Sequence, residues 1–334
     1  MASLGGSFNP AESYNWTGTH THTGTNTEGG ATRLYGTTAP ISGPAGTGYL
    51  VAANGSTYLN VNSKVLYVNE TGAASPYWTP LGIDSHPNML AWYTDFRDMQ
   101  GKALANTDAV AILAGSGLRI HGSGVEASDS GVVVTAGEAG PIATVTASAA
   151  NAKIVALSFG ATDSSNLPMQ PDREGPMVVE ATVQMATALT LRRFFLGFLG
   201  TCADALVSPV TGATTTITLV QDDLAGLYFD AGLTAATTLF APHNKSDEAA
   251  TMTTAAAALD VATVFPAAGT GVRLRVEIAA NGTMRCFADR VLVATVANAL
   301  DVDEEVAPVL LIGSTSTAVK AMVVARFAAW GTRA

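Results

Sequence analysis

The stretch RLRVEIAANGTMRCFADRVLVATVA, residues 273–297, decides the fold of this chain. Apolar Leu274, Val276 and Ile278 alternate with charged residues, and this period of two predicts a strand with one buried face. The Asn281-Gly282 pair that follows favours a type I′ turn. The alternation then resumes, so the stretch predicts an antiparallel pairing with a fixed register.

A second turn is expected at Asp289-Arg290, which makes the stretch a three-stranded meander. Further strand patterns recur at short intervals over residues 126–334, as in all-β sandwiches. The candidate strands are Gly131–Thr135, Ala143–Ala147, Ile154–Phe159, Met177–Met185, Arg192–Leu199, Thr215–Val220, Gly226–Asp230, Val272–Ala279, Thr283–Ala288, Val291–Val296, Pro308–Gly313 and Ala321–Ala329.

The meander resembles the concanavalin-like jelly roll of laminin-G, pentraxin and legume-lectin domains. The flanking strands LRRFFLGFLG (191–200) and PVLLIGSTS (308–316) fit the order of that family, and Arg290 stands where the family usually has Gly. The resemblance covers about residues 130–334. It implies an antiparallel β-sandwich and says little about function, because the fold hosts many activities.

Residues 1–85 form a separate region with two basic residues, Arg33 and Lys64. TGTHTHTGTNTEGG (17–30) suits an extended arm, and residues 56–82 predict two short strands. The expected fold class is therefore all-β, with an extended amino-terminal arm carrying short β-elements before the sandwich. We expect the arm to become ordered along neighbouring chains.

Residues 86–125 are expected to connect the two regions. Within them, Met89, Trp92 and Phe96 fall on one side of a short predicted helix near 87–98.

The amino-terminal region resembles virion proteins of tailed bacteriophages. GTHTHTGTNTEGG (18–30) is similar to an element of phage fibre and decoration proteins, with Thr23 where Asp is usual. VLYVNETGAASPYWTPLG (65–82) is similar to an element of phage head and tail appendages. The resemblance implies a structural virion protein, assembled in the host cytoplasm and localised to the virion.

Composition favours a packing protein. Hydrophobic residues make up 48% of the chain and charged residues 13%, against about 25% charged in an ordinary domain. The net charge of −10 argues against a nucleic-acid partner, which needs clustered Lys and Arg. The stretch MASLGGSFNP lacks the features of a signal peptide, and no membrane span is expected. Cys202 and Cys286 are expected to be buried free thiols.

His20 and His22 form the most suggestive metal motif. Residues two apart on a strand share a face, so three chains could present six imidazoles to a transition metal on a three-fold axis. The alternative is a polar arm that hydrogen-bonds to a neighbour, because one chain supplies too few ligands. No other cofactor is expected.

The remaining polar motifs give little sign of catalysis. Asp301, Asp303, Glu304 and Glu305 suit either a Ca²⁺ loop or a solvated turn. Glu180 and Glu277 alternate with apolar residues, as outward-facing strand positions do. The Glu-x-Asp-x-x-Glu string of glucanases, a nucleophile elbow and a P-loop are all missing from the sequence, so no enzyme activity is expected.

Two functional hypotheses remain open. The first is a capsid decoration (cement) protein, a homotrimer bound to the major capsid protein or other virion subunits and anchored by aromatic residues. These anchors are Tyr14, Trp16, Tyr35, Tyr77 and Trp78. The second is a head or tail fibre whose jelly roll binds a host glycan at a loop edge lined by Tyr228, Phe240 and His243.

Overall fold

The computed structural model describes the chain in segments, and the account below concerns these residues. They are 31–44, 50–81, 89–96, 102–103, 110–111, 117–122, 131–137, 140–147, 153–159, 168–185, 189–203, 206–245, 251–253, 260–265, 269–315 and 320–332. The described residues form four β-sheets and one short helix, α1 (Pro171–Glu174). The all-β expectation is confirmed.

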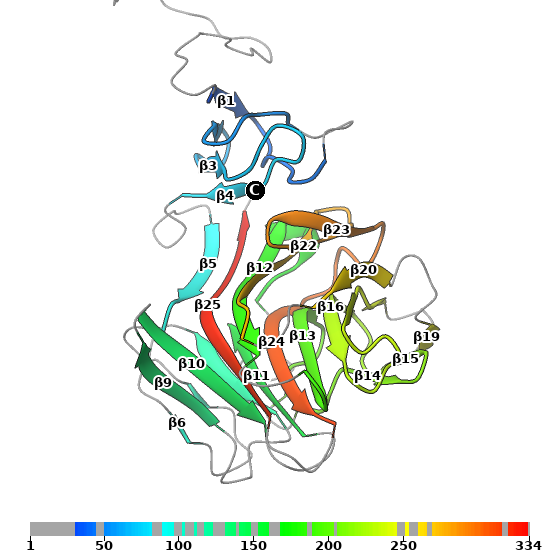
Figure 1. Ribbon diagram of the computed structural model, residues 1–334. Coiled ribbons are helices and arrows are strands. Elements are labelled where there is room, and N and C mark those ends of the chain that lie inside the picture. The colour runs from blue at the N-terminus through cyan, green and yellow to red at the C-terminus, as the bar shows by residue number, and fades with distance from the viewer. Residues whose placement is uncertain are drawn as a thin grey trace, which may run out of the picture.

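Two large antiparallel sheets face each other as a β-sandwich (Figure 1). The first, called the β25 sheet, has the order β23 (Val291–Val296), β22 (Met284–Ala288), β21 (Val272–Ile278), β12 (Met177–Met185), β25 (Lys320–Thr332), β10 (Gly140–Ala147), β9 (Gly131–Gly137) and β6 (Lys102–Ala103), and β5 (Met89–Thr94) also pairs with β25.

The second large sheet is called the β24 sheet. Its order is β20 (Asp260–Val264), β17 (Thr238–Phe240), β16 (Leu224–Asp230), β13 (Arg192–Leu199), β24 (Ala307–Ser314), β11 (Ile154–Phe159), β8 (Leu118–His121) and β7 (Val110–Ala111), and β18 (His243–Asn244) pairs with β16.

Strand alternation builds the main core between these sheets. Val179 of β12 and Val276 of β21 point inward from the β25 sheet, and Phe194 of β13 meets them from the β24 sheet. Phe159 and Phe327 stack across the gap with ring centroids 4.5 Å apart. The sandwich therefore has a continuous aromatic and aliphatic interior.

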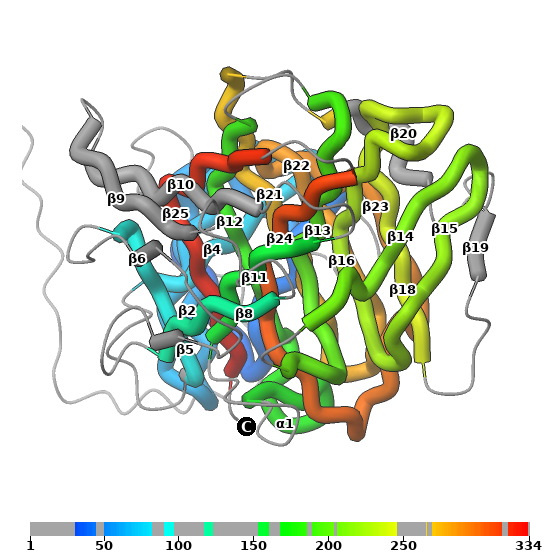
Figure 2. The backbone as a smooth tube through the Cα atoms, turned by 90° about the horizontal axis from the view of Figure 1, so that it is seen from below, coloured from blue at the N-terminus to red at the C-terminus, as the bar shows by residue number. Residues whose placement is uncertain are grey.

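A third layer covers the outer face of the β24 sheet. It consists of β14 (Val210–Ala213), β15 (Thr216–Leu219) and β19 (Thr251–Thr253). β14 and β15 lie beyond β16 in Figures 1 and 2. Val210 and Ile217 of this layer pack with Phe195 and Tyr228 of the β24 sheet in a second apolar core. Both faces of the β24 sheet are thus buried.

A fourth layer is the amino-terminal sheet. It contains β1 (Arg33–Gly36), β2 (Thr57–Asn60), β3 (Leu66–Asn69) and β4 (Trp78–Pro80), with β1 and β2 parallel. The short β-elements expected in residues 1–85 are therefore present. They pack against this chain's own β25 sheet, near the end of β25 (Figure 1).

Two local predictions are wrong. The helix expected near 87–98 is strand β5, whose register with β25 pairs Trp92 with Ala329. Pairing with the central strand outweighs a weak helical pattern. At the first meander turn, Gly282 has φ +75° but Asn281 has no positive φ, so the turn is not type I′.

Type I′ geometry is found at the second turn instead. Asp289 and Arg290 have φ values of 46° and 70°, so both central residues are left-handed, as a type I′ turn requires. Arg290 holds this conformation without glycine's freedom, which costs on the order of 1 kcal/mol. Its side chain forms an ion pair with Glu70 of the amino-terminal region.

Candidate functional site

The amino-terminal sheet and the outer face of the β25 sheet enclose a polar interior. An apolar contact comes first: Tyr58, Tyr67 and Trp78 of the amino-terminal sheet pack on Val178 and Trp330 of the β25 sheet. Tyr58 and Trp78 meet edge to face with centroids 6.0 Å apart. Beside this contact lies a cluster of charged residues.

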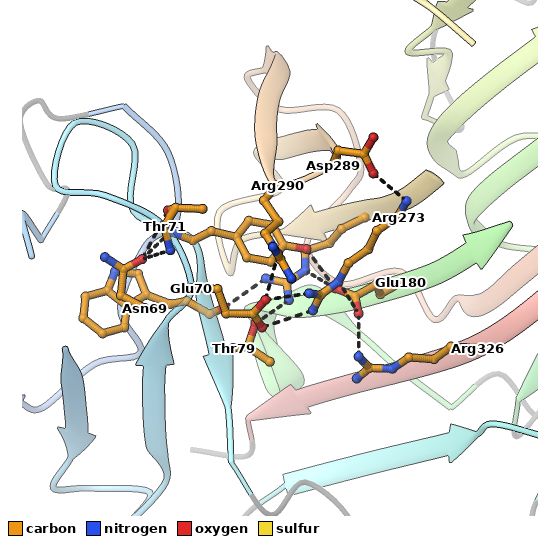
Figure 3. A network of polar contacts seen from close by, with 12 residues as sticks. Asn69, Glu70, Thr71, Thr79, Glu180, Arg273, Asp289, Arg290 and Arg326 are labelled. Carbon is orange, nitrogen blue, oxygen red and sulfur yellow. Dashed lines mark hydrogen bonds and ion pairs between the residues drawn. The ribbon is translucent and has the colours of Figure 1, made fainter. Parts of the chain in front are cut away.

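Glu180 is the centre of that cluster, and its side chain is fully buried (Figure 3). Its Oε2 accepts hydrogen bonds from Arg275 Nε at 2.9 Å and Tyr77 Oη at 2.8 Å. Its Oε1 lies 3.0 Å from Arg273 Nε and 3.3 Å from Arg326 Nη1. One carboxylate thus contacts three guanidinium groups.

Strand register explains why these charges meet. Arg275 of β21 lies directly opposite Glu180 of β12. Arg273 and Arg326 both lie opposite Thr182, two residues further along and hence on the same face of the sheet. The charged alternation in the sequence is therefore the outer face of the sandwich, as predicted, but this face is covered by the amino-terminal sheet.

The same arginines hold the amino-terminal sheet in place. Arg273 Nη1 donates to Glu70 Oε2 at 2.6 Å, and Arg290 Nε reaches the same oxygen at 2.9 Å. Arg275 Nη1 donates to the carbonyl of Trp78 at 2.9 Å, and its Nη2 donates to Thr79 Oγ1 at 3.0 Å. The left-handed Arg290 therefore gains an ion pair to a segment about two hundred residues away in sequence.

Arginine contacts decide the ionisation of Glu180. Burial by itself would raise the pKa of Glu180, but Arg275, Arg273 and Arg326 outweigh burial and lower the pKa to about 2. Burial raises the pKa of Tyr77, which keeps the phenol protonated as a donor to Glu180.

A pH dependence of stability follows from the lowered pKa of Glu180. The unfolded carboxyl has a pKa near 4.5, so the contribution of Glu180 is complete above about pH 4.5 and is lost as pH falls toward 2. The free energy of unfolding is expected to drop by up to about 1.4 kcal/mol per pH unit in this window from Glu180 alone. Urea unfolding at a series of acidic pH values measures it. The Glu180→Gln variant should lack this part of the slope, and equal slopes in both proteins would contradict the assignment.

A cavity of about 680 Å³ opens beside the cluster and is called here the Trp78 cavity. One wall belongs to the amino-terminal sheet and its loops, and the other to β12, β21, β22 and β25 of the sandwich. Its lining is Thr37, Thr38, Ala39, Pro40, Ile41, Ser42, Asn60, Asn62, Ser63, Tyr67, Trp78, Gly175, Pro176, Val178, Glu277, Ala279, Ala280, Arg285, Trp330 and Thr332.

Glu277 is the carboxylate of the Trp78 cavity. It accepts a hydrogen bond from Arg275 Nη1 at 3.1 Å and lies opposite Arg285 in the β21–β22 register. Burial raises the pKa of Glu277, although Arg275 opposes this effect. Glycoside hydrolysis uses two carboxyl groups across a cleft, and Glu277 is the one carboxylate in the described lining.

The structure corrects part of the predicted partner surface. Tyr77 and Trp78 are 0% and 2% exposed and pack inside this chain, so they cannot be the aromatic anchors for another subunit. Tyr35 is partly buried in β1. Tyr14 and Trp16 lie outside the described residues, and so do His20 and His22.

The predicted glycan edge is also wrong. Tyr228 and Phe240 are fully buried in the second apolar core, and only His243 keeps partial exposure. Tyr228 is instead part of a buried polar group: Asp230 Oδ2 accepts from the Tyr228 hydroxyl and from Arg193 Nε at 2.8 Å. The aromatic residues Tyr228 and Phe240 therefore pack beneath the third layer and line no exposed edge.

The acidic run forms surface contacts. Asp301 Oδ1 lies 3.6 Å from Lys245 Nζ, and Glu305 Oε1 lies 3.8 Å from Arg173 Nη1. In the described part of the chain, no three His, Cys, Asp or Glu residues group as metal ligands would. Cys202 and Cys286 are buried and form no disulfide, as expected.

One Ser-His pair occurs in the interior. Ser158 Oγ and His121 Nε2 are 2.5 Å apart, and both residues are fully buried in neighbouring strands of the β24 sheet. Neither residue lines the Trp78 cavity. A hydroxyl without access to a substrate is a packing element.

No helix in the described residues is long and apolar enough to cross a membrane.

Comparisons with known proteins concern the fold. No protein-family model and no curated sequence matches the chain. Solved structures that resemble it include SO2946 from Shewanella oneidensis MR-1, a protein of unknown function (TM-score 0.43, 8% identity, covering 73% of this chain and 87% of that one). Others are the Emp47p carbohydrate recognition domain (0.42, 7%, 73% and 98%) and peanut lectin with a 9mer peptide (0.42, 8%, 73% and 97%).

Proposed function

We propose that this chain is a structural protein of a tailed-bacteriophage virion, and that it decorates the capsid by attaching through the outer face of its amino-terminal sheet. The major capsid protein or another virion subunit is the proposed partner, with a homotrimer as the assembled form and the virion as its location. Association, and not catalysis, is the proposed activity.

A row of exposed leucines carries this proposal. Leu59 of β2 pairs with Leu66 of β3, and the amide of Leu81 donates to the Leu66 carbonyl, so the three residues lie side by side on one face. Their exposed fractions are 38%, 39% and 46%. Adjacent apolar side chains on an outer sheet face favour contact with another protein over solvation.

The position of the leucine row in the sequence supports a virion partner. Leu66 and Leu81 belong to VLYVNETGAASPYWTPLG (65–82), the element that resembles phage head and tail appendages. In this element, Asn69 Oδ1 accepts from the amides of Thr71 and Tyr77 and thereby shapes the turn between β3 and β4. The element is thus a rigid hairpin with one face docked inward and leucines on the other.

Replacing Leu66 by Glu tests the proposed surface. The variant is expected to bind empty shells of the virion's major capsid protein at least about tenfold more weakly, because a buried interface leucine would be exchanged for a charge. Co-sedimentation with shells measures the affinity. Val207→Glu, at an apolar residue 52% exposed on the sandwich, is the matched control and should bind like the wild type. Unchanged binding of Leu66→Glu would refute the surface.

Copy number per virion separates decoration from the second hypothesis, a head or tail fibre. A copy number close to that of the major capsid protein is expected for decoration. A few copies at a single attachment point would instead identify a fibre and reject decoration.

A further inference from the structure

We propose that the outer face of the amino-terminal sheet is a basic docking face, and that its partner is an acidic protein surface with an apolar centre. This inference rests on the proposed function, in which the leucine row contacts another virion subunit. It adds the chemical character of that partner, which the leucine row alone does not give.

The leucine row is part of a longer apolar ladder across the sheet. Leu59 of β2 lies opposite Leu66 of β3 on one side and opposite Tyr35 of β1 on the other. Leu34 packs toward the sandwich, and successive side chains of a strand point to opposite faces, so Tyr35 joins the leucine row on the outer face. The ladder therefore consists of Tyr35, Leu59, Leu66 and Leu81.

An exposed cation lies on each side of this ladder. Arg33 stands two residues before Tyr35 in β1, and hence on the same face of the sheet. Lys64 stands in the turn between β2 and β3, two residues before Leu66. Strands β1 and β2 are parallel and both run toward this turn, so the two cations flank the ladder from opposite ends of the strands.

The charges of the amino-terminal region do not balance on this face. In the described segments 31–44 and 50–81, Glu70 is the single acidic residue, and Arg273 and Arg290 of the sandwich hold it at 2.6 and 2.9 Å. The whole chain, in contrast, carries a net charge of −10. A basic face on an acidic protein attracts an acidic partner, and it disfavours face-to-face contact with the same face of a second copy, because like charges would then be opposed.

A nucleic acid or an anionic membrane would also attract cations, but the observations favour a protein. Anionic lipid surfaces are typically bound by clusters of roughly four to eight basic residues, and phosphate backbones also need clustered Lys and Arg. The net charge of −10 opposes both polyanions. An apolar centre with a charged rim, on a sheet of fixed register, is instead the anatomy of a protein interface.

Charge reversal at the rim tests the chemistry of the partner in the co-sedimentation assay with empty shells. Lys64→Glu is expected to bind at least about fivefold more weakly than the wild type at about 50 mM NaCl. The difference should shrink at about 500 mM NaCl, because salt screens charges at an exposed rim. Arg33→Glu should behave in the same way, whereas Lys64→Arg, which keeps the charge, should bind like the wild type.

Arg173→Glu is the matched control. It changes the net charge by the same amount as Lys64→Glu, at an arginine of α1 whose side chain is 65% exposed outside the amino-terminal sheet. This control should bind shells like the wild type. Vesicles of phosphatidylserine and phosphatidylcholine, and double-stranded DNA, should not bind the wild type.

Several results would overturn the proposal. Equal losses in Lys64→Glu and Arg173→Glu would show that overall charge alone matters, and a salt-independent affinity of the wild type would exclude an acidic partner. Binding to the vesicles or to DNA would identify another class of partner. Self-association of the isolated protein that Lys64→Glu abolishes would make a second copy the occupant of the face.

The Leu66→Glu variant distinguishes this inference from the proposed function. Weaker shell binding of Leu66→Glu together with unchanged binding of Lys64→Glu would reject the acidic partner and leave the proposed surface intact. A wild-type protein that does not bind shells would reject both.

Discussion

Glu180→Gln is expected to lower the free energy of unfolding by about 3–5 kcal/mol, because it removes the buried carboxylate that faces three arginines and leaves the buried Arg275 with Glu277 as its remaining carboxylate partner. Arg275 is 0% exposed and cannot lose its proton, so the variant cannot neutralise the site. Arg275 also holds the backbone of Trp78. The same substitution should therefore loosen the contact between the amino-terminal sheet and the β25 sheet.

Urea unfolding at neutral pH measures the loss, and hydrogen exchange at β4 reports the loosened contact. Glu305→Gln removes a carboxylate that is 54% exposed in its ion pair with Arg173, so its midpoint should stay that of the wild type. A Glu180→Gln protein as stable as the Glu305→Gln control would show that the cluster does not stabilise the fold.

Asp230→Asn is expected to cost a comparable amount, about 3–5 kcal/mol, on the other side of the sandwich. Asp230 is fully buried opposite Arg193 in the β13–β16 register. Its oxygens also accept from the amides of Gly212 at 3.0 Å and Gly232 at 2.7 Å. The amide side chain would leave Arg193 charged and would offer one acceptor oxygen where two are used.

Thermal and urea unfolding measure the effect of Asp230→Asn, with Asp303→Asn in the exposed loop as the isosteric control. Gly212 lies in β14, so protection of β14 and β15 amides from hydrogen exchange should fall more than protection of β25. Asp230 would not be the link between the β24 sheet and the third layer if β14, β15 and β25 lost protection from hydrogen exchange equally, or if the variant lost no stability.

Local patterning was enough to predict the sandwich. Met177–Met185 and Arg192–Leu199 were predicted with the bounds that the structure shows, because long apolar strands have few competing conformations. Strand β5 was missed because its pairing with β25 is a long-range contact that no local pattern records. β8 (Leu118–His121) was missed as well, since four residues carry little periodicity.

The site was harder to predict for a related reason. An alternating charge such as Glu180 normally indicates a solvent-facing strand position. Glu180 becomes buried only when the amino-terminal sheet has folded over it. No local pattern predicts this cover, because the contact between Glu70 and Arg273 spans 203 residues. The one local signal was Arg290, which occupies a turn position that usually requires Gly. A non-Gly residue held in a left-handed conformation indicates that its side chain makes a specific contact.

The place of β25 in its sheet has a consequence for biosynthesis. This strand, Lys320–Thr332, pairs with β12, β10 and β5, so it joins three segments that were translated much earlier. Until residue 332 has left the ribosome, β12 lacks one of its two neighbours and Trp330 cannot support the amino-terminal sheet. The edges of β12, β10 and β5 that β25 will cover therefore stay unpaired until the end of synthesis, and unpaired strand edges favour aggregation.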